Sequence, residues 1–349
     1  RTKHIMSDSP YCITFDDILA AAKRIEGLAH KTPVLTSSSL NEVAKGRKLF
    51  FKVEALQKTG SFKFRGAVNA IFSLIETTGE TDETIQVVTH SSGNHAQALA
   101  LAAKTAGGKV KATIVMPESA PGVKKAAVLS YGGHVIDVES TNEARESKAN
   151  EVQREMGAEF IHPSEDPRVI AGQGTACLEM IAQVKDLNED LQVVVIPVGG
   201  GGLASGNITT LRGLLGKNVK IILAEPKELD DAKRSFYAGE LLRHSTDNKL
   251  KSVADGLKTT LGPNTWPIIR DFVDDIYTVS EEEILRATKL IWERLKVCIE
   301  PSAGVGVAVV MGEEFQNKYP VEQYKNVGII LCGGNVDFIK TSALMAKVL

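Results

Sequence analysis

The chain has 349 residues, of which 43% are hydrophobic and 24% charged; this composition excludes large-scale disorder and leaves room for about two domains. Lysine and arginine together number 41 and aspartate and glutamate 43, so the net charge is −2, and a protein that binds nucleic acid through a broad basic surface is not expected. No apolar run approaches the ~20 residues of a membrane span, and the spacing of the four cysteines fits neither a zinc site nor a disulfide framework, so we expect a reduced, cytoplasmic protein.

Strand-like and helix-like segments alternate along the chain, which is typical of an α/β protein with parallel sheets. A first helix is expected after Thr14, because Phe15-Asp16-Asp17 places acidic residues in its first turn. The predicted strands span 49–53, 85–89, 112–116, 135–138, 193–198, 221–225 and 328–332, and the predicted helices include 96–105, 142–156, 203–215 and 281–295. Several strands are nearly continuous apolar runs, which indicates sheets covered on both faces.

The four strand–helix units between about Ile85 and Pro163 are compact enough to form one domain. No internal repeat and no low-complexity linker marks a boundary elsewhere. We therefore expect a small domain over residues 85–164 and a large, discontinuous domain made of residues 6–84 and 165–349.

A first motif, Thr59-Gly60-Ser61-Phe62-Lys63-Phe64-Arg65-Gly66, follows a strand and opens a helix. A lysine at a helix N-terminus faces the positive end of the helix dipole, which lowers its pKa and favours the neutral amine. A neutral amine is the form that a Schiff-base lysine needs. The alternative is an ordinary surface lysine in a turn.

A second motif, Thr89-His90-Ser91-Ser92-Gly93-Asn94-His95, also lies between a strand and a helix. Hydroxyl groups, an amide and backbone N–H groups meet there, which favours a carboxylate-binding or oxyanion-binding loop. The alternative is a capped helix start without a ligand.

A third motif places Gly199-Gly200-Gly201-Gly202 between the strand 193–198 and a helix. Glycines allow a ligand to approach the backbone closely, and free N–H groups at a helix start favour a phosphate. Gly199-x-Gly201-x-x-Ala204, with Glu225 ending the next strand, also fits the loose dinucleotide fingerprint. An NAD-dependent oxidoreductase therefore stays open at this point.

Together the three motifs resemble those of the fold-type II pyridoxal-phosphate enzymes: their lysine motif at 61–66, their substrate-carboxylate loop at 91–95 and their phosphate loop at 199–202. The likeness continues through 171–175, 254–256, 300–304 and 333–335 and covers about residues 15–337. Within this family the chain is most similar to the eukaryotic serine racemases, with the serine/threonine dehydratases as close relatives. The resemblance implies the tryptophan synthase β-like fold, with two open, twisted, parallel-rich sheets flanked by helices.

The resemblance implies catalytic roles for Lys63, which would hold pyridoxal 5′-phosphate covalently and act as base on one face of the substrate Cα, and for Ser92, which would serve the opposite face. It further assigns the cofactor to Phe62, Lys63, Asn94, Gly199, Gly200, Gly201, Gly202 and Cys332, and the substrate to Ser91, Ser92, Asn94, His95 and Arg145. Two positions depart from the racemases. Cys332 replaces the usual serine at the pyridine nitrogen, and Ser164 replaces an asparagine, which puts one cofactor contact in doubt.

Glu225 and Asp231 follow the strand 221–225, and two carboxylates with an intervening carbonyl suit Mg²⁺ or Ca²⁺. The resemblance supports such an ion and adds the backbone carbonyl of Leu229. It also implies a homodimer and ATP as a possible allosteric activator, bound by Ser37, Ser38, Lys58, Thr59, Gln97, Tyr131, Lys296 and Asn335.

The activity implied by the resemblance is the interconversion of L- and D-serine, with elimination of water from serine to give pyruvate and ammonia. Three alternatives remain: an L-serine/L-threonine dehydratase without significant racemase activity, an aspartate racemase of the same lineage and, from another class, the NAD-dependent oxidoreductase. In each case we expect a small-molecule substrate and neither a nucleic-acid nor a membrane partner.

Overall fold

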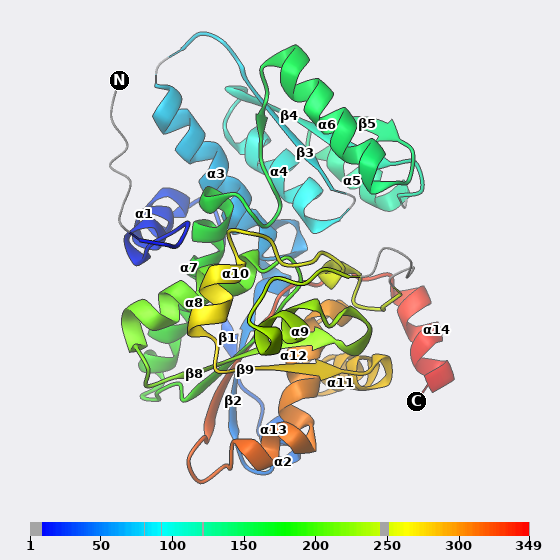
Figure 1. The fold of residues 1–349 in the computed structure, drawn as a ribbon. Coiled ribbons are helices and arrows are strands. Elements are labelled where there is room, and N and C mark those ends of the chain that lie inside the picture. Colours follow the sequence, from blue (N-terminus) through cyan, green and yellow to red (C-terminus); the bar gives the residue numbers. More distant parts are fainter. Residues whose placement is uncertain (1–8, 80, 92, 121, 245–250, 349) are drawn as a thin grey trace.

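The structure is a computed structural model that describes residues 9–79, 81–91, 93–120, 122–244 and 251–348. Two sheets organise these residues (Figure 1). The larger sheet has the strand order β1 (Val34–Leu35), β2 (Lys48–Val53), β10 (Asn326–Leu331), β7 (Val193–Pro197), β8 (Lys220–Pro226) and β9 (Asp275–Val279). The smaller has the order β5 (His134–Val138), β4 (Val110–Pro117), β3 (Ile85–His90) and β6 (Glu159–Phe160). All neighbouring strands are parallel except β1 and β2, so the predicted α/β fold with two parallel-rich sheets is confirmed.

Helices connect most of the strands. The α-helices of the described residues are α1 (Phe15–Ile25), α2 (Ser38–Val43), α3 (Lys63–Thr78), α4 (Asn94–Thr105), α5 (Gly122–Ser130), α6 (Asn142–Met156), α7 (Pro167–Asp186), α8 (Gly202–Leu215), α9 (Asp231–Ala238), α10 (Trp266–Phe272), α11 (Glu281–Arg294), α12 (Pro301–Met311), α13 (Glu313–Lys318) and α14 (Phe338–Val348). Short 3-10 helices are η1 (Glu54–Leu56), η2 (Lys58–Gly60), η3 (Lys227–Leu229) and η4 (Asp255–Leu257). None of these helices is long and apolar enough to cross a membrane.

The first helix begins where its capping residues predict. The Thr14 hydroxyl accepts a hydrogen bond from the backbone N–H of Asp17, and the Asp17 carboxylate accepts one of 2.7 Å from the backbone N–H of Thr14. This reciprocal pair satisfies two N–H groups that the first turn of a helix leaves without partners. The sequence pattern therefore sets the start of α1.

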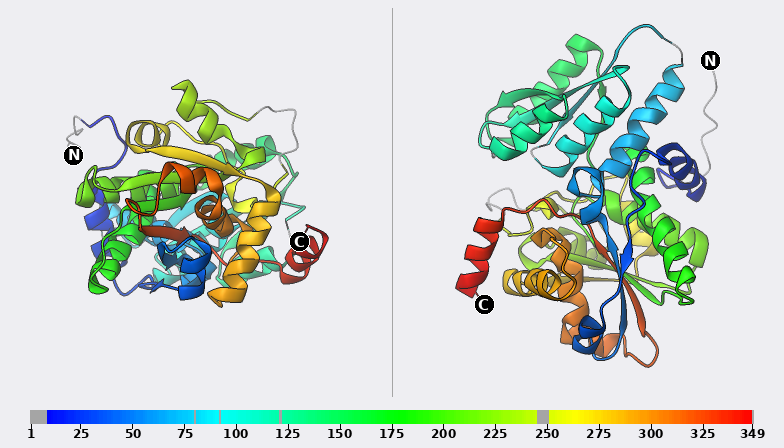
Figure 2. Two further views of the ribbon diagram at one scale, coloured as in Figure 1. Left: turned by 90° about the horizontal axis from the view of Figure 1, so that it is seen from below. Right: turned by 180° about the vertical axis from the view of Figure 1, so that it is seen from behind.

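The chain forms two lobes, each built around one of the two sheets, as Figures 1 and 2 show. The four-stranded sheet with α4, α5 and α6 forms one lobe, and the six-stranded sheet with α8 to α13 forms the larger part of the other. Helix α3 packs against both α4 and α7 and thus links the lobes. Each lobe has its own apolar core, and the α3 residues Phe64, Ala67 and Val68 belong to the core of the smaller one.

Most predicted elements are confirmed, with ends that shift by at most two residues. The strand predicted over 328–332 spans Asn326–Leu331, so Cys332 is the first residue after β10 rather than its last. Strand β9 was not predicted, because Asp275 and Tyr277 interrupt the apolar pattern of this short segment. The four strands of the smaller sheet all lie between Ile85 and Phe160, and the division into domains at 84/85 and 164/165 stays a prediction.

Candidate active site

A cavity of about 960 Å³ lies where several parallel strands end. Its wall includes residues at or just after the carboxyl ends of β3, β4, β7 and β10. Loops from neighbouring parallel strands meet at this edge, which is where α/β proteins bind ligands. The cavity is lined by the predicted residues Phe62, Lys63, Ser91, Asn94, His95, Arg145, Gly199, Gly200, Gly201, Gly202 and Cys332, and by Ser164. The structure thus brings together all the predicted cofactor and substrate residues that it describes.

Lys63 is the first residue of α3, and its amine faces the cavity. Nζ donates a hydrogen bond of 2.7 Å to the carbonyl oxygen of Pro163 and lies 5.1 Å from the centre of the Phe62 ring. Burial of the amine lowers the pKa of Lys63 to about 8. The helix dipole predicts a lowered pKa for this lysine; the pKa is lowered, and burial of the amine is its main cause. The result is an amine that is partly neutral near neutral pH.

The turn that holds Pro163 is itself fixed by a histidine. The Nδ1 atom of His162 accepts hydrogen bonds from the backbone N–H groups of Ser164 (3.1 Å) and Glu165 (2.9 Å). Burial lowers the pKa of His162 to about 4, so the ring stays neutral and Nδ1 can accept. The sequence analysis gave His162 and Pro163 no role, because the partner of Pro163 lies 100 residues away along the chain.

The glycine loop is packed so closely that side chains would not fit. Gly201 precedes α8 with a φ of +83°, the left-handed region that favours glycine. A Cβ on Gly200 would lie 2.5 Å from the Ser164 hydroxyl oxygen, and a Cβ on Gly199 would lie 2.9 Å from the Leu257 Cα. The loop therefore leads directly into the N-terminus of α8, a position that favours an anion.

The Asn94 side chain is held from two sides. Its Nδ2 donates to the Glu300 carboxylate at 3.0 and 3.2 Å, and its Oδ1 accepts a hydrogen bond of 2.8 Å from Asn335 Nδ2. Burial raises the pKa of Glu300 to about 7. Glu300 stands in one of the matching segments, 300–304, but the sequence analysis assigned it no function. The local sequence indicated only that Glu300 directly precedes Pro301 at the start of a helix, α12.

His95 and Ser91 lie at the start of α4 and at the end of β3. Nε2 of the His95 ring is 3.2 Å from the Ile161 carbonyl oxygen, so the proton belongs on Nε2, while the buried Nδ1 has no partner in the described structure. Burial lowers the pKa of His95 well below its usual value. The Ser91 hydroxyl accepts a hydrogen bond from the Gly93 N–H. Ser92, the predicted second acid/base residue, lies outside the described residues.

Cys332 and Arg145 form other parts of the wall. Burial raises the pKa of the Cys332 thiol, which is therefore neutral. Its backbone carbonyl accepts a hydrogen bond of 3.1 Å from the Phe62 N–H, which ties the end of β10 to the lysine motif. Arg145 lies on α6 and donates to the Thr141 carbonyl oxygen. Glu143 and Glu146 line the cavity beside it, so this wall carries both signs of charge.

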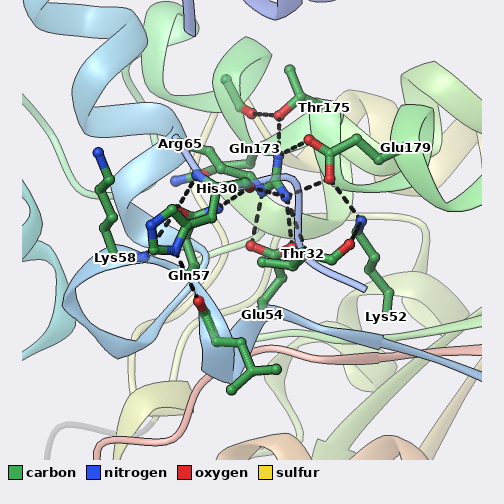
Figure 3. A network of polar contacts seen from close by, with 12 residues as sticks. His30, Thr32, Lys52, Glu54, Gln57, Lys58, Arg65, Gln173, Thr175 and Glu179 are labelled. Carbon is green, nitrogen blue, oxygen red and sulfur yellow. Dashed lines mark hydrogen bonds and ion pairs between the residues drawn. The ribbon is translucent and has the colours of Figure 1, made fainter. Parts of the chain in front are cut away.

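A buried ionic network fixes the first turn of α3 (Figure 3). The guanidinium of Arg65, two residues after Lys63, donates to both oxygens of Glu54 (2.8 Å each) and of Glu179 (2.7 and 2.8 Å). Glu179 also accepts a hydrogen bond of 2.7 Å from Lys52 Nζ. Arg65, Glu54 and Lys52 are completely buried. The sequence analysis gave Arg65 no role, although it belongs to the lysine motif.

The two predicted metal-binding carboxylates lie close in the structure but bind backbone groups. Glu225 accepts hydrogen bonds from the N–H groups of Ala232 (3.2 Å) and Lys233 (2.8 Å). Asp231 accepts one of 3.0 Å from Leu261 N–H and lies 3.1 Å from Nε2 of His244. Burial, with the neighbouring Asp231 charge, raises the pKa of Glu225. Leu229 is buried in η3, and within the described residues no three side chains of His, Cys, Asp or Glu are grouped as they would be to hold a metal ion.

Glu225 also decides against the dinucleotide alternative. Its side chain is only 1% exposed and both oxygens accept backbone hydrogen bonds. Glu225 also does not line the cavity that the glycine loop lines, so a ribose beside a phosphate at that loop would not reach it. The interpretation of 199–204 and Glu225 as a dinucleotide fingerprint is therefore wrong.

The predicted nucleotide-binding residues come from several elements. Lys58 and Thr59 lie in η2, which packs against α4, the helix of Gln97. Asn335 Nδ2 donates a hydrogen bond of 2.8 Å to the Thr59 carbonyl oxygen. The others are Ser37 before α2, Ser38 within it, Tyr131 after α5 and Lys296 after α11. Thr59 and Asn335 are the one pair of this set joined by a hydrogen bond in the described part of the chain.

Comparison with known proteins gives a consistent result. A model of the family described as "Pyridoxal-phosphate dependent enzyme" matches residues 25–333. Serine racemase from Rattus norvegicus is 48% identical over 332 residues, which cover 95% of this chain and 96% of that protein.

Solved structures agree with this. The crystal structure of serine racemase from Dictyostelium discoideum superposes with a TM-score of 0.85 at 48% identity and covers 93% of this chain and 99% of that one. A pyridoxal 5′-phosphate-dependent aspartate racemase gives a TM-score of 0.87 at 39% identity, covering 95% and 99%. A threonine deaminase from T.th. superposes with a TM-score of 0.84 at 40% identity, and the match covers 93% of this chain and 99% of that one.

Proposed function

Because the chain belongs to the family of pyridoxal-phosphate dependent enzymes, we propose that it interconverts L- and D-serine and also eliminates water from serine to give pyruvate and ammonia. The observation that carries the proposal is the amine of Lys63, which faces the same cavity as the glycine loop and has a pKa of about 8. The near full-length similarity to serine racemases supports serine as the substrate.

The residues around the cavity fit pyridoxal phosphate. The backbone of the glycine loop, which lines the cavity without side chains of its own, and the start of α8 suit a phosphate group. We assign the covalent bond to Lys63, the phosphate to Gly199, Gly200, Gly201 and Gly202, the face of the ring to Phe62, its 3′-oxygen to Asn94 and its nitrogen to Cys332. When bound, the cofactor supplies an electron sink that makes the substrate α-proton acidic. The neutral thiol of Cys332 leaves the ring nitrogen without a charged partner.

Racemisation needs a proton acceptor on one face of the substrate Cα and a proton donor on the other. Lys63 Nζ is the group we assign to the first face, since a pKa of about 8 gives a useful fraction of neutral amine near neutral pH. We assign the opposite face to Ser92, from the resemblance of 91–95 to the racemase loop. Elimination needs the first transfer and loss of the β-hydroxyl, which explains how one site performs both reactions.

The substrate carboxylate belongs at the start of α4. Free N–H groups of the first turn, with the side chains of Ser91 and Asn94, favour an anion there. We add Ser92 from the resemblance of 91–95 to the racemase loop. His95 contributes a neutral ring with an unpaired, buried Nδ1. We assign Arg145 to the wall that surrounds the substrate side chain.

We also propose that Mg²⁺ or Ca²⁺ binds Glu225, Asp231 and the carbonyl oxygen of Leu229. Hard divalent cations prefer oxygen ligands, and a cation would offset the repulsion between two buried carboxylates. Each carboxylate keeps lone pairs besides those that accept the backbone hydrogen bonds. The ion would stabilise the segment between β8 and α9 and would take no part in the proton transfers.

ATP as an allosteric activator, bound at the residues named above, and a homodimeric assembly are further proposals. One chain of contacts supports a link between that site and the cavity: Asn335 donates to the Thr59 carbonyl oxygen on one side and to Asn94 Oδ1 on the other. A ligand that moves Asn335 would therefore move Asn94. The cytoplasmic location predicted from the cysteines stays a prediction.

Two neighbouring activities remain as alternatives. A serine/threonine dehydratase needs the same proton abstraction by Lys63 and differs in lacking delivery to the second face. An aspartate racemase would need a cation for the second carboxylate, and Arg145 in the cavity wall is suited to this role. The deciding experiment measures, in parallel assays, D-serine and pyruvate formed from L-serine, 2-oxobutyrate formed from L-threonine, and D-aspartate formed from L-aspartate. D-serine together with pyruvate from L-serine supports our proposal, whereas pyruvate alone or D-aspartate supports the respective alternative.

A further inference from the structure

The hydroxyl group of Thr265 lies directly behind the glycine loop. Thr265 is completely buried, and its Oγ1 is 3.1 Å from the carbonyl oxygen of Gly200. A Cβ on Gly201 would lie 2.7 Å from the Thr265 Cβ, so the two residues are packed as closely as glycine allows. Thr265 immediately precedes α10 and does not line the cavity.

Thr265 is fixed in turn by Glu165. One carboxylate oxygen of Glu165 is 3.0 Å from the Thr265 hydroxyl, and the other accepts a hydrogen bond of 2.8 Å from the Asn264 N–H. The Asn264 side chain donates back to the Glu165 carbonyl oxygen at 2.7 Å. Glu165 lies where the chain returns from the four-stranded sheet toward α7. The turn around Thr265 is therefore tied to the segment between the two lobes.

The Thr265 hydroxyl has a single proton to donate, and three acceptors surround it. They are the Glu165 carboxyl group and the carbonyl oxygens of Gly200 (3.1 Å) and Gly262 (3.3 Å). Burial raises the pKa of Glu165, and in the state in which its carboxyl group is protonated, that group can donate to Oγ1 instead of accepting from it. The hydroxyl proton is then left for Gly200, the nearer of the two carbonyl oxygens.

The contact with Gly200 decides how the loop faces a ligand. In a trans peptide the carbonyl oxygen and the following N–H point in opposite directions. With the Gly200 carbonyl turned toward Thr265, the Gly201 N–H lies on the other side of the peptide. Glycines can flip such a peptide at little cost, and a carbonyl oxygen turned toward an anion repels it, whereas an N–H attracts it.

We propose that Thr265 is a positioning residue for the cofactor phosphate: by holding the Gly200 carbonyl it keeps the glycine loop in its anion-binding orientation, and Glu165 holds Thr265 in place. This inference rests on the proposed function, because the anion is taken to be the phosphate of pyridoxal phosphate. It concerns a residue that touches neither the substrate nor the cofactor.

The test is to titrate cofactor-free protein with pyridoxal 5′-phosphate and, separately, with pyridoxal, which lacks the phosphate. In Thr265→Val, which keeps the shape but removes the hydroxyl, the Kd for pyridoxal phosphate should rise roughly tenfold, as expected for one lost hydrogen bond and a freed carbonyl. The Kd for pyridoxal should stay within about twofold of wild type. The phosphorus NMR signal of the bound cofactor should also shift.

Conservative variants separate positioning from general damage. Thr265→Ser retains the hydroxyl and should restore the preference for the phosphorylated ligand. Glu165→Ala should lose part of this preference, about threefold, whereas Glu165→Gln, which can still bond Asn264 and Thr265, should keep it. If Thr265→Val does not fold, Glu165→Ala and Glu165→Gln test the proposal instead. The quantity compared is the ratio of the Kd for pyridoxal to the Kd for pyridoxal phosphate.

If the ratio of the Kd for pyridoxal to the Kd for pyridoxal phosphate is unchanged in Thr265→Val or in Glu165→Ala, the inference is overturned. This includes an equal loss of affinity for both ligands, and it leaves the proposed function intact. A wild-type protein that binds no pyridoxal phosphate would instead overturn the proposed function and this inference with it.

Discussion

The amine of Lys63, at the start of α3, is hydrogen-bonded at 2.7 Å to the carbonyl oxygen of Pro163, in the segment that returns from the four-stranded sheet. A carbonyl oxygen can accept a hydrogen bond from both the neutral and the charged amine, so this bond orients Nζ in either protonation state. Burial is the main cause that lowers the pKa of Lys63 to about 8. Position and reactivity of the amine thus have separate origins.

Replacement of Lys63 by alanine should abolish both covalent attachment of the cofactor and turnover, because the variant lacks the amine that forms the bond. The fold should persist, since α3 packs through Phe64, Ala67 and Val68. Visible absorbance of the bound cofactor and circular dichroism measure the two effects. The exposed Lys23→Ala variant is the control and should behave as wild type. Wild-type turnover in Lys63→Ala would move the covalent site elsewhere.

Glu300 should make stability fall as the pH rises through the neutral range. Its pKa of about 7 in the folded protein lies above the value of 4.5 taken for the unfolded chain, so the folded state binds more protons between these values. The stabilising contribution is therefore complete below about pH 4.5 and is lost as pH rises toward 7. Glu300→Gln, which resembles the protonated form, should gain stability relative to wild type over this interval, by a few kcal/mol.

The measurement for Glu300 is the midpoint of urea unfolding of the cofactor-free protein at several pH values from 4 to 8. Because both proteins share every other titrating group, only the difference between them is informative. A difference that does not change with pH would contradict the raised pKa.

Ser92→Ala should separate racemisation from elimination. With L-serine, Lys63 still removes the α-proton, so pyruvate formation should survive in part. D-serine formation should fall by about 10²–10⁴-fold, the usual contribution of a general acid–base group. D-serine itself should become a poor substrate for either reaction. Chiral product analysis with both enantiomers measures this, and undiminished racemisation would remove Ser92 from the mechanism.

The metal proposal predicts that a chelator lowers the Tm of the holoenzyme and that added Mg²⁺ or Ca²⁺ restores it, since an ion that binds only the folded state stabilises it. Glu225→Gln should abolish this response, because the ion loses a charged oxygen ligand. Glu228→Gln, on the adjacent exposed surface, is the matched control and should respond as wild type. If neither Tm nor rate responds to chelation, the ion site is not there.

The buried network of Figure 3 predicts a large effect of Arg65→Met. Removal of the guanidinium leaves Glu54 buried without its cation, which typically costs about 3–5 kcal/mol of unfolding free energy. Arg24→Met, at the more exposed pair with Glu76, should cost no more than about 1 kcal/mol. Urea unfolding measures both. Equal effects of the two substitutions would mean that burial of the network contributes little.

Several properties followed from short-range signals. Apolar runs of strand length located β2, β3, β4, β5, β7, β8 and β10, and Thr14 with the acidic residues that follow it located the start of α1. The lysine, asparagine and glycine loops could be found because each places chemically suited residues between a strand and a helix. The structure brings these loops to one cavity, because the carboxyl ends of parallel strands meet at one edge of a sheet.

The tertiary structure decided which residues support those loops. Pro163, Glu300 and Thr265 contact the site from positions far along the chain, and nothing in their local sequence indicates a partner. Their roles depend on strand order and helix packing, which bring together groups that periodicity cannot relate.

The tertiary structure also decided the burial of charged side chains and, through burial, their pKa values. Glu225 resembled a ribose-binding carboxylate until its side chain was found buried against the backbone of α9, and the pKa of Lys63 is set by desolvation that only the packed cavity produces. A side chain's type and local spacing determine what it can do. Its exposure and partners, which arise only when distant segments pack, determine what it does.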